Sequence, residues 1–380
     1  MHILIIPSWY STDSNSFTGS YFREQAHALS KEGHKVNIVY IENRYTSKLF
    51  SKMPVQMYAD NGFKVYTIQL PLSVKGIIYF FPGLISFIGI HLFEYYCKQE
   101  GSPDLLHAHS AKYAGFIASV LNKRFAVPYV LTEHLSKLIK KNIPFHQKSI
   151  FKAGYKNARR IFAVSNSLAG AMKPLVSGRN IEIFENMVDE EFFNIPENAI
   201  PETPFIFTAI GNLIDIKGDD LLIKAFYQSQ KNKNAKLLIA GEGNARKKLQ
   251  RLITQLELEN QVSFLGSLSR EEVKRLLQSS HVLVSSSLYE TFGITLIEAM
   301  ACGLPVLSTR SGGPDTIVTI ETGLLVKPGD IAQLAGGLKM IRENYPSYNK
   351  GVIRKSCIEK YGKKHTIEKL LNAYHETLQT

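Results

Sequence analysis

The chain has 380 residues, of which 44% are hydrophobic and 21% are charged. This length allows two domains with cores of their own, and the composition is typical of a globular protein and excludes a disordered or fibrous one. The three cysteines, Cys97, Cys302 and Cys357, show neither a disulfide framework nor zinc-ligand spacing. Because the chain also starts without the basic segment of a signal peptide, we expect a cytoplasmic protein.

Positive charge is concentrated in the first half of the chain. Residues 1–180 contain 22 Lys and Arg against 9 Asp and Glu, whereas residues 181–380 contain 23 against 24. No nucleic-acid-binding motif accompanies the basic residues, so we exclude nucleic acid and expect contact with an anionic membrane surface or a phosphorylated lipid. The protein would then be peripheral, on the inner face of the cytoplasmic membrane. The alternative is a solvated basic face without a partner. The densest part comprises Lys137, Lys140, Lys141, Lys148, Lys152, Lys156, Arg159 and Arg160.

Strands and helices alternate along this first half. A buried strand at 2–6 precedes a helix at 22–32, which ends before Gly33, a residue that commonly terminates helices. A second helix is expected at 114–124. Further strands are expected near 36–41, 63–68, 104–108, 127–132, 161–164 and 181–184.

Residues 76–96 form an unusually apolar and aromatic stretch. Pro82-Gly83 interrupts it, and His91 and Glu94 lie within it, which argues against a membrane span. Three interpretations stay open: a span, a helix that lies in the membrane interface, and an ordinary helix of the domain.

The second half repeats the alternation after an acidic, proline-containing break at 187–204. Alternating strands and helices predict a parallel sheet with helices on both faces, here formed twice. The fold class is therefore α/β, with two Rossmann-like doubly wound domains. The expected strands are 205–210, 236–240, 262–265, 282–284 and 305–308, and the expected helices are 219–230, 245–257, 270–279, 295–302, 330–343 and 364–378.

The most informative motif lies at 285–303, where seven residues separate Glu290 from Glu298. The apolar spacing predicts a helix that starts near Thr295, so Glu298 is expected in its first turn. Unpaired N–H groups from Gly293 to Leu296 and the positive end of the helix dipole favour phosphate, while carboxylates accept hydrogen bonds from sugar hydroxyls. Together they predict a nucleotide-sugar as the ligand.

This motif resembles the hallmark of the retaining glycosyltransferases of family four, which carry two glutamates at the same spacing. The resemblance extends through 303–306, 311–315 and 322–326, covers most of the chain and is densest at 205–330. It implies the GT-B fold, in which two Rossmann-like domains face each other across a cleft.

The resemblance also assigns the two domains. Residues 1–190 would bind the acceptor and residues 191–363 the nucleotide-sugar donor, with a last helix at 364–380 packing back on the first domain. Glu290 and Lys217 would be catalytic, with Lys217 holding the donor pyrophosphate. Asn212 stands where the family usually carries an arginine, which is a departure from its pattern. The donor site would comprise Gly211, Asn212, Gly241, Leu265, Phe292, Gly293, Ile294, Thr295 and Glu298.

The first domain contributes fewer candidates. His134 follows a predicted strand, and the family places a histidine there beside the donor sugar, so His134 is a catalytic candidate. His109 ends another predicted strand and is a weaker candidate. Gly19 and Ser20 resemble the family's glycine-containing loop, which contacts phosphate and acceptor; the family often has paired glycines there.

We therefore expect a hexosyltransferase that moves a sugar from a UDP- or GDP-linked donor to a glycan or lipid-linked acceptor. The family implies retention of anomeric configuration and a role in bacterial-type surface polysaccharide or lipopolysaccharide assembly. No cofactor is expected, and since no two aspartates form an Asp-x-Asp motif, no metal is expected either. The alternatives are a nucleotide-sugar epimerase of the same architecture and a non-catalytic protein that binds nucleotide-sugars.

Overall fold

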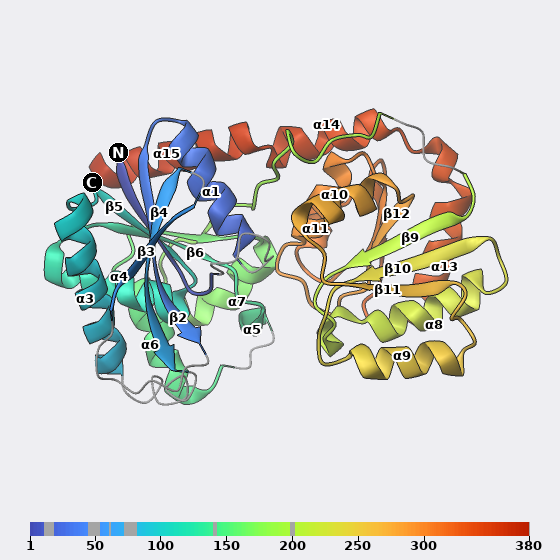
Figure 1. The fold of residues 1–380 in the computed structure, drawn as a ribbon, viewed down its shortest axis with the longest axis horizontal. Coiled ribbons are helices and arrows are strands. Elements are labelled where there is room, and N and C mark those ends of the chain that lie inside the picture. Colours follow the sequence, from blue (N-terminus) through green and yellow to red (C-terminus); the bar gives the residue numbers. More distant parts are fainter. Residues whose placement is uncertain are drawn as a thin grey trace. The chain divides into compact units, whose positions relative to one another are not determined.

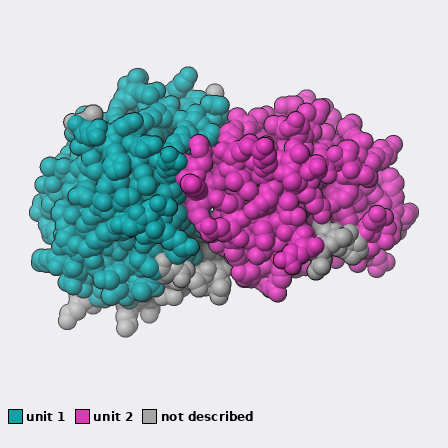
Figure 2. Space-filling model, turned by 90° about the horizontal axis from the view of Figure 1, so that it is seen from above, with its two compact units in different colours: residues 1–185, 367–380 teal, residues 186–366 magenta. Residues whose placement is uncertain are grey.

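The computed structural model describes residues 1–10, 19–44, 54–60, 62–71, 82–139, 143–197 and 202–379. The chain forms two compact units, which Figure 2 distinguishes by colour. Unit 1 comprises Met1–Glu185 and Ile367–Thr380, and unit 2 comprises Asn186–Thr366. Each unit is built around one sheet with helices on both faces (Figure 1), so the α/β doubly wound prediction is confirmed.

The sheet of unit 1 has eight strands in the order β3-β4-β2-β1-β5-β6-β7-β8. All neighbouring pairs are parallel except β3 and β4, which are antiparallel. The strands are β1 (His2–Pro7), β2 (Lys35–Arg44), β3 (Gln56–Asp60), β4 (Phe63–Pro71), β5 (Leu105–His109), β6 (Tyr129–Glu133), β7 (Arg160–Ala163) and β8 (Glu182–Ile183). The helices are α1 (Ser20–Lys31), α3 (Pro82–Glu100), the π-helical turn η1 (Ala111–Gly115), α4 (Phe116–Phe125), α5 (Ser136–Ile139), α6 (Phe145–Lys156) and α7 (Asn166–Val176).

Helix α3 settles part of the question about the apolar stretch at 76–96. Ile85, Ile88, Leu92 and Tyr96 are buried at helical spacing, and the helix packs against α4, β2 and β4. From residue 82 onward the stretch is therefore a helix of the domain, and the preceding part lies outside the described residues. No helix in the described part of the chain is long and apolar enough to cross a membrane.

The sheet of unit 2 has six strands in the order β11-β10-β9-β12-β13-β14, all parallel. The strands are β9 (Phe205–Ile210), β10 (Ala235–Ala240), β11 (Val262–Gly266), β12 (Val282–Ser285), β13 (Val306–Thr309) and β14 (Gly323–Val326). The helices are η2 (Asp215–Lys217), α8 (Asp219–Gln230), α9 (Arg246–Gln255), α10 (Arg270–Gln278), α11 (Ile294–Ala301), α12 (Pro314–Ile317), α13 (Ile331–Glu343), η3 (Tyr345–Ser347) and α14 (Lys350–Tyr361).

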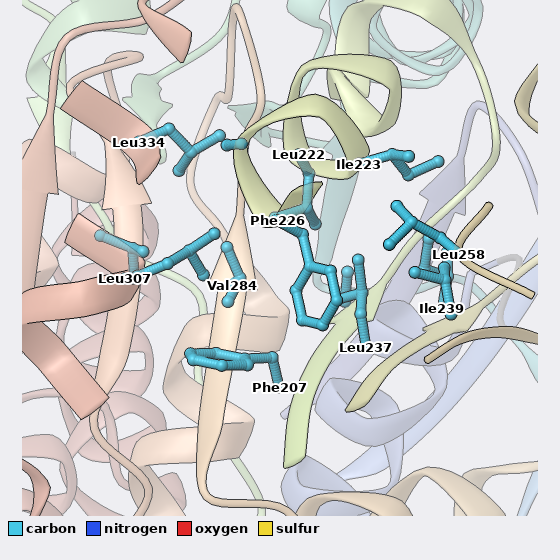
Figure 3. Packing of buried hydrophobic residues seen from close by; sticks show 14 of the residues in the cluster. Phe207, Leu222, Ile223, Phe226, Leu237, Ile239, Leu258, Val284, Leu307 and Leu334 are labelled. Atoms are coloured by element: carbon cyan, nitrogen blue, oxygen red, sulfur yellow. The ribbon is translucent and has the colours of Figure 1, made fainter. Parts of the chain in front are cut away.

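One face of this sheet is covered by α8, α9 and α13, whose apolar side chains form a continuous core with the strands. Figure 3 shows Phe207 of β9 beneath Phe226 of α8, with Leu307 and Leu334 beside them. The two phenylalanine rings meet edge to face, with centroids 6.1 Å apart. This core fixes the strand order and thereby the place of the loops that follow each strand.

Helix α15 (Lys363–Gln379) begins in unit 2 and has most of its length in unit 1. At its start, Lys363 forms ion pairs with Asp189 (3.2 Å) and Glu191 (2.7 Å) of unit 2. Further along, the buried Tyr374 hydroxyl lies 2.6 Å from Nδ1 of His107 in unit 1. The C-terminal part of α15 is thus packed in the core of unit 1.

Two strands were not predicted. β3 is a short strand at the edge of the sheet whose side chains are mostly exposed, so it lacks the apolar pattern that marks a strand. β14 has four residues, and none of its side chains after the buried Gly323 is fully buried. The predicted helix at 114–124 starts earlier, as the π-helical turn η1.

Candidate functional site

Loops that follow neighbouring strands of unit 2 are layered on one another at the carboxyl edge of the sheet. The N–H of Gly211 donates to the Ala240 carbonyl (3.0 Å), and the N–H of Gly241 donates to the Gly266 carbonyl (2.7 Å). Gly241 has φ of 136°, and a Cβ there would lie 1.8 Å from the carbonyl oxygen of Gly211. Only glycine therefore allows the loops after β9, β10 and β11 to approach this closely.

The two candidate catalytic residues of unit 2 are brought together by the loops after β9 and β12. Lys217 Nζ lies 2.6 Å from Glu290 Oε2, and the two side chains are 31% and 15% exposed. The Ser286 hydroxyl donates to the Lys217 carbonyl (2.9 Å), and a Cβ on Gly218 would lie 2.3 Å from the Ser286 carbonyl oxygen. The ion pair is thus held by close backbone packing on both sides.

The backbone of Glu290 is held by a segment that the sequence did not single out as part of the site. Its N–H donates to the Ser311 carbonyl (3.0 Å), and its carbonyl accepts from the N–H of Gly313 (2.8 Å). A Cβ on Gly313 would lie 2.2 Å from the Phe292 carbonyl oxygen. The adjacent glycines Gly312 and Gly313 after β13 were the available signal, because paired glycines often mark close backbone approach.

Helix α11 begins one residue earlier than predicted, because Gly293 adopts a left-handed conformation (φ 108°) directly before it. The prediction that Glu298 lies in the first turn is therefore wrong, since it is the fifth helical residue and lies in the second turn. Ile294 and Thr295 occupy the first turn. Phe292 is 1% exposed and packs against the Tyr361 ring at 5.6 Å, so its side chain belongs to the core.

The loops after β10 and β11 carry the remaining residues predicted for the donor. Leu265 is 38% exposed on β11. Arg246, which the sequence did not single out, pairs with Glu242 (2.6 Å) and lies over the Phe264 ring at 5.0 Å. Asn212 is exposed.

Asp219 opens helix α8 two residues after Lys217. Burial raises the pKa of its carboxyl to about 6, and the nearby Lys217 only partly opposes this effect. A carboxyl with a raised pKa therefore lies close to Lys217.

In unit 1 the candidate histidines lie at the carboxyl ends of two adjacent strands: His109 ends β5 and His134 directly follows β6. His109 Nδ1 lies 3.1 Å from His134 Nε2, so the two rings share one hydrogen bond. Behind them, His107 Nε2 lies 2.8 Å from the Thr132 hydroxyl, and the His107 and His109 ring centroids are 4.0 Å apart. His134 is partly exposed, whereas His107 and His109 are fully buried.

The residue that holds this cluster is Glu133, which was not predicted. Its fully buried carboxylate accepts the backbone N–H groups of His134 (2.9 Å) and Leu135 (3.0 Å). It also accepts the Ala111 N–H (3.0 Å) and the Tyr155 hydroxyl (2.6 Å). A buried carboxylate with several donors rigidly joins the elements that supply them.

Burial also determines the charge of the histidines. It lowers the pKa of His107 and of His134 to about 3, and that of His109 well below its ordinary value. All three rings are therefore neutral near pH 7.

The glycine-containing loop is described only at its ends. Gly19 has φ of 79° and precedes α1, and a Cβ there would lie 3.1 Å from Tyr10 Cα. Ser20 is the first residue of α1, and residues 11–18 lie outside the described part of the chain. Among the described residues, no group of three His, Cys, Asp or Glu side chains is placed to hold a metal ion.

Comparisons with known proteins agree with this architecture. Residues 18–192 match the family model described as Glycosyltransferase Family 4, and residues 190–359 match that described as Glycosyl transferases group 1. The chain belongs to glycosyltransferase family four.

Individual relatives span nearly the whole chain. The N-acetyl-alpha-D-glucosaminyl L-malate synthase of Bacillus anthracis is 27% identical over 370 residues, 92% of this chain and 91% of its own. One component of the human phosphatidylinositol N-acetylglucosaminyltransferase is 25% identical over 328 residues, 84% of this chain and 64% of its own. The crystal structure of Anabaena HepE in complex with UDP superposes with a TM-score of 0.75 at 18% identity, covering 99% of this chain and 100% of that one.

The buried histidines generate a prediction on stability. Because their folded pKa values lie below the unfolded value near 6.5, their contribution to stability is complete above pH 6.5 and is lost as the pH falls toward about 3. We expect the free energy of unfolding of unit 1 to fall between pH 6.5 and 5 by up to about 1.4 kcal/mol per pH unit for each histidine. Urea denaturation followed by the fluorescence of Trp9, the one tryptophan, measures it.

His107→Gln should make this pH dependence less steep, whereas His91→Gln, at an exposed position of α3, should leave it unchanged. A free energy of unfolding that is constant over this pH range would contradict the assignment of neutral buried rings.

Proposed function

We propose that this glycosyltransferase moves a sugar from a nucleotide-sugar to a glycan or lipid-linked acceptor, with unit 2 binding the donor and unit 1 the acceptor. The observation that carries the proposal is the Lys217–Glu290 pair (2.6 Å) at the carboxyl edge of the unit 2 sheet. Ligands of open α/β sheets bind at this edge. The pair therefore supplies a cation for phosphate and a carboxylate for sugar hydroxyls in the same place.

The diphosphate would bind at the N-terminus of α11. The N–H groups of Ile294 and Thr295 lie in the first helical turn, where intrahelical acceptors are lacking and the helix dipole is positive. Lys217 would then exchange its contact with Glu290 for the outer phosphate. Glu298, one turn further along, would accept the ribose hydroxyls. The names of the Bacillus anthracis and human relatives and the UDP bound to Anabaena HepE favour UDP-N-acetylglucosamine as the first donor to test.

The proposed reaction is metal-independent and retains configuration. The acceptor hydroxyl oxygen attacks the anomeric carbon on the face from which the diphosphate departs, and the hydroxyl proton passes to a phosphate oxygen. The bond between the anomeric carbon and the phosphate oxygen breaks. The helix N–H groups, which are fixed in direction, and Lys217, once it has left Glu290, would stabilise the negative charge that develops on the leaving diphosphate.

The membrane would be contacted through a basic stripe on α6. Lys148, Lys152 and Lys156 are exposed and spaced four residues apart, so they lie along one face of the helix. Phe145, the first residue of α6, is 88% exposed, as suits an aromatic anchor at a membrane interface. Arg160, which belongs to the densest basic part of the sequence, pairs with Glu182 and Glu376, and we do not include it in this surface.

The two glutamates of the motif should have separable roles. Glu298→Ala should weaken UDP binding by about 1.5–3 kcal/mol, the range for hydrogen bonds to charged groups. Glu290→Gln should leave UDP affinity within a few-fold and mainly lower turnover, because it contacts the transferred sugar. Calorimetry with UDP and a transfer assay with UDP-N-acetylglucosamine measure the two effects, and Glu321→Ala, at an exposed loop position, is the control. Equal losses of UDP affinity in both variants would refute these roles.

Lys217 should discriminate between nucleoside diphosphate and monophosphate. Lys217→Ala should remove most of the preference for UDP over UMP and lower turnover by orders of magnitude, because the leaving phosphate loses its cation. Lys224→Ala, on the exposed side of α8, should change neither quantity. If the absence of the family's arginine at position 212 only weakens the binding of the diphosphate, Asn212→Arg should tighten UDP binding. Retained discrimination in Lys217→Ala would place the cation elsewhere.

The α6 stripe should control membrane binding. Each Lys near an anionic surface contributes on the order of 1 kcal/mol, so Lys148→Glu, Lys152→Glu and Lys156→Glu together should release the protein from phosphatidylserine vesicles at low salt. Reversal of Lys233, Lys236 and Lys247, exposed in unit 2, is the matched control. Vesicle co-sedimentation measures binding, and UDP affinity should be unchanged. If the wild-type protein does not sediment with the vesicles at low salt, the α6 stripe is a solvated basic face and the membrane proposal is refuted.

A further inference from the structure

The cluster behind His134 determines which of its ring nitrogens can act on a ligand. We propose that His109 is a positioning residue that holds His134 with its proton on Nδ1, so that His134 donates a hydrogen bond to an oxygen of the bound substrate. The inference rests on the proposed function insofar as it takes unit 1, which contains His134, to bind a substrate of the sugar transfer.

The contact between the rings admits two arrangements. His109 Nδ1 and His134 Nε2 are 3.1 Å apart, so one nitrogen carries a proton and donates while the other accepts. If His134 donates, His109 must carry its own proton on Nε2. If His109 donates from Nδ1, its Nε2 carries only a lone pair.

The surroundings of His109 Nε2 decide between them. This atom is buried and has no hydrogen-bond partner within the described part of the chain. A buried N–H without an acceptor is rarer and more costly than an acceptor that lacks a donor. The second arrangement therefore prevails, in which Nδ1–H of His109 donates to Nε2 of His134.

The state of His134 follows from this. Its ring is neutral near pH 7, since burial lowers its pKa to about 3, and a neutral ring has one N–H. Because Nε2 accepts from His109, the proton must be on Nδ1. No described protein group is hydrogen-bonded to that Nδ1, and His134 as a residue is not fully buried. His134 thus presents a donor, not a base.

Neighbouring groups prevent His109 from turning its ring. His107 lies against it at 4.0 Å and is itself held by Thr132 (2.8 Å) and Tyr374 (2.6 Å). The Phe22 ring lies against His109 at 4.6 Å. Because Glu133 holds the backbone of His134, both partners of the hydrogen bond are immobilised. Such support is what a positioning residue requires.

Nitrogen-15 NMR of the full chain labelled at histidine tests the tautomer directly. Loss of one set of signals in His134→Asn assigns that ring. In the wild type, we expect protonated Nδ1 and unprotonated Nε2 for His134. In His109→Leu, which cannot donate, we expect His134 to shift toward the Nε2–H form that free imidazole favours. A His134 that carries its proton on Nε2 in the wild type overturns the proposal.

Kinetics separates positioning from a merely structural role. His109→Leu should lower kcat about tenfold, as for one neutral hydrogen bond, with little change in donor KM. His109→Asn should restore much of kcat, because its amide can donate from the same side. His91→Leu is the control on an exposed position. If His109→Leu no longer folds, as Trp9 fluorescence would reveal, the wild-type tautomer still decides.

The proposed role of His109 and the proposed function can be refuted separately. A His134 with Nδ1–H whose replacement by Asn leaves sugar transfer intact would support the tautomer and remove His134 from the proposed reaction. A His134 with Nε2–H whose replacement abolishes transfer would overturn the role of His109 and leave the proposed function standing.

Discussion

The parallel order of the strands is the constraint on which both candidate sites depend. In a parallel sheet every strand ends at the same edge, so loops that are far apart in sequence emerge side by side. In unit 2 this brings Lys217, after β9, to within 2.6 Å of Glu290, after β12. In unit 1 it brings His109, at the end of β5, to within 3.1 Å of His134, after β6. Without the strand order, neither pair would exist.

The two sites use this edge in different ways. Unit 2 presents charge, because a lysine and a carboxylate remain partly exposed at the start of a helix whose N–H groups point outward. Unit 1 presents neutral rings, because burial removes the charge from three neighbouring histidines. A charged site suits a diphosphate, whereas a neutral donor suits a sugar hydroxyl. The difference in charge between the two sites follows from the difference in the solvent exposure of their polar groups.

Backbone contacts rather than side chains give the unit 2 site its precision. Gly241 and Gly313 lie so close to neighbouring carbonyl groups that any Cβ would collide with them. The backbone N–H and C=O of Glu290 are held by Ser311 and Gly313, and its carboxylate is held by Lys217. In unit 1 the same task falls to the buried carboxylate of Glu133, which gathers four donors. In unit 2, glycine allows the loops to pack closely, whereas in unit 1 the buried carboxylate of Glu133 joins the loops by hydrogen bonds.

The sequence by itself determined the α/β class and most strand positions, since apolar periodicity and glycine placement are local properties. Through the resemblance to family four it also predicted Glu290 and Lys217 as site residues, and the structure brings their side chains to 2.6 Å. It missed β3 and β14, whose side chains are mostly exposed or only partly buried and so lack a buried apolar run. It also placed the start of α11 one residue too late, because the conformation of Gly293 decides where that helix starts. Only the tertiary structure revealed the clamp from Ser311 and Gly313, the pairing of Arg160 with two glutamates, and the contact of His109 with His134. These depend on distances between segments far apart in the chain, which packing against the core sets and no local pattern encodes.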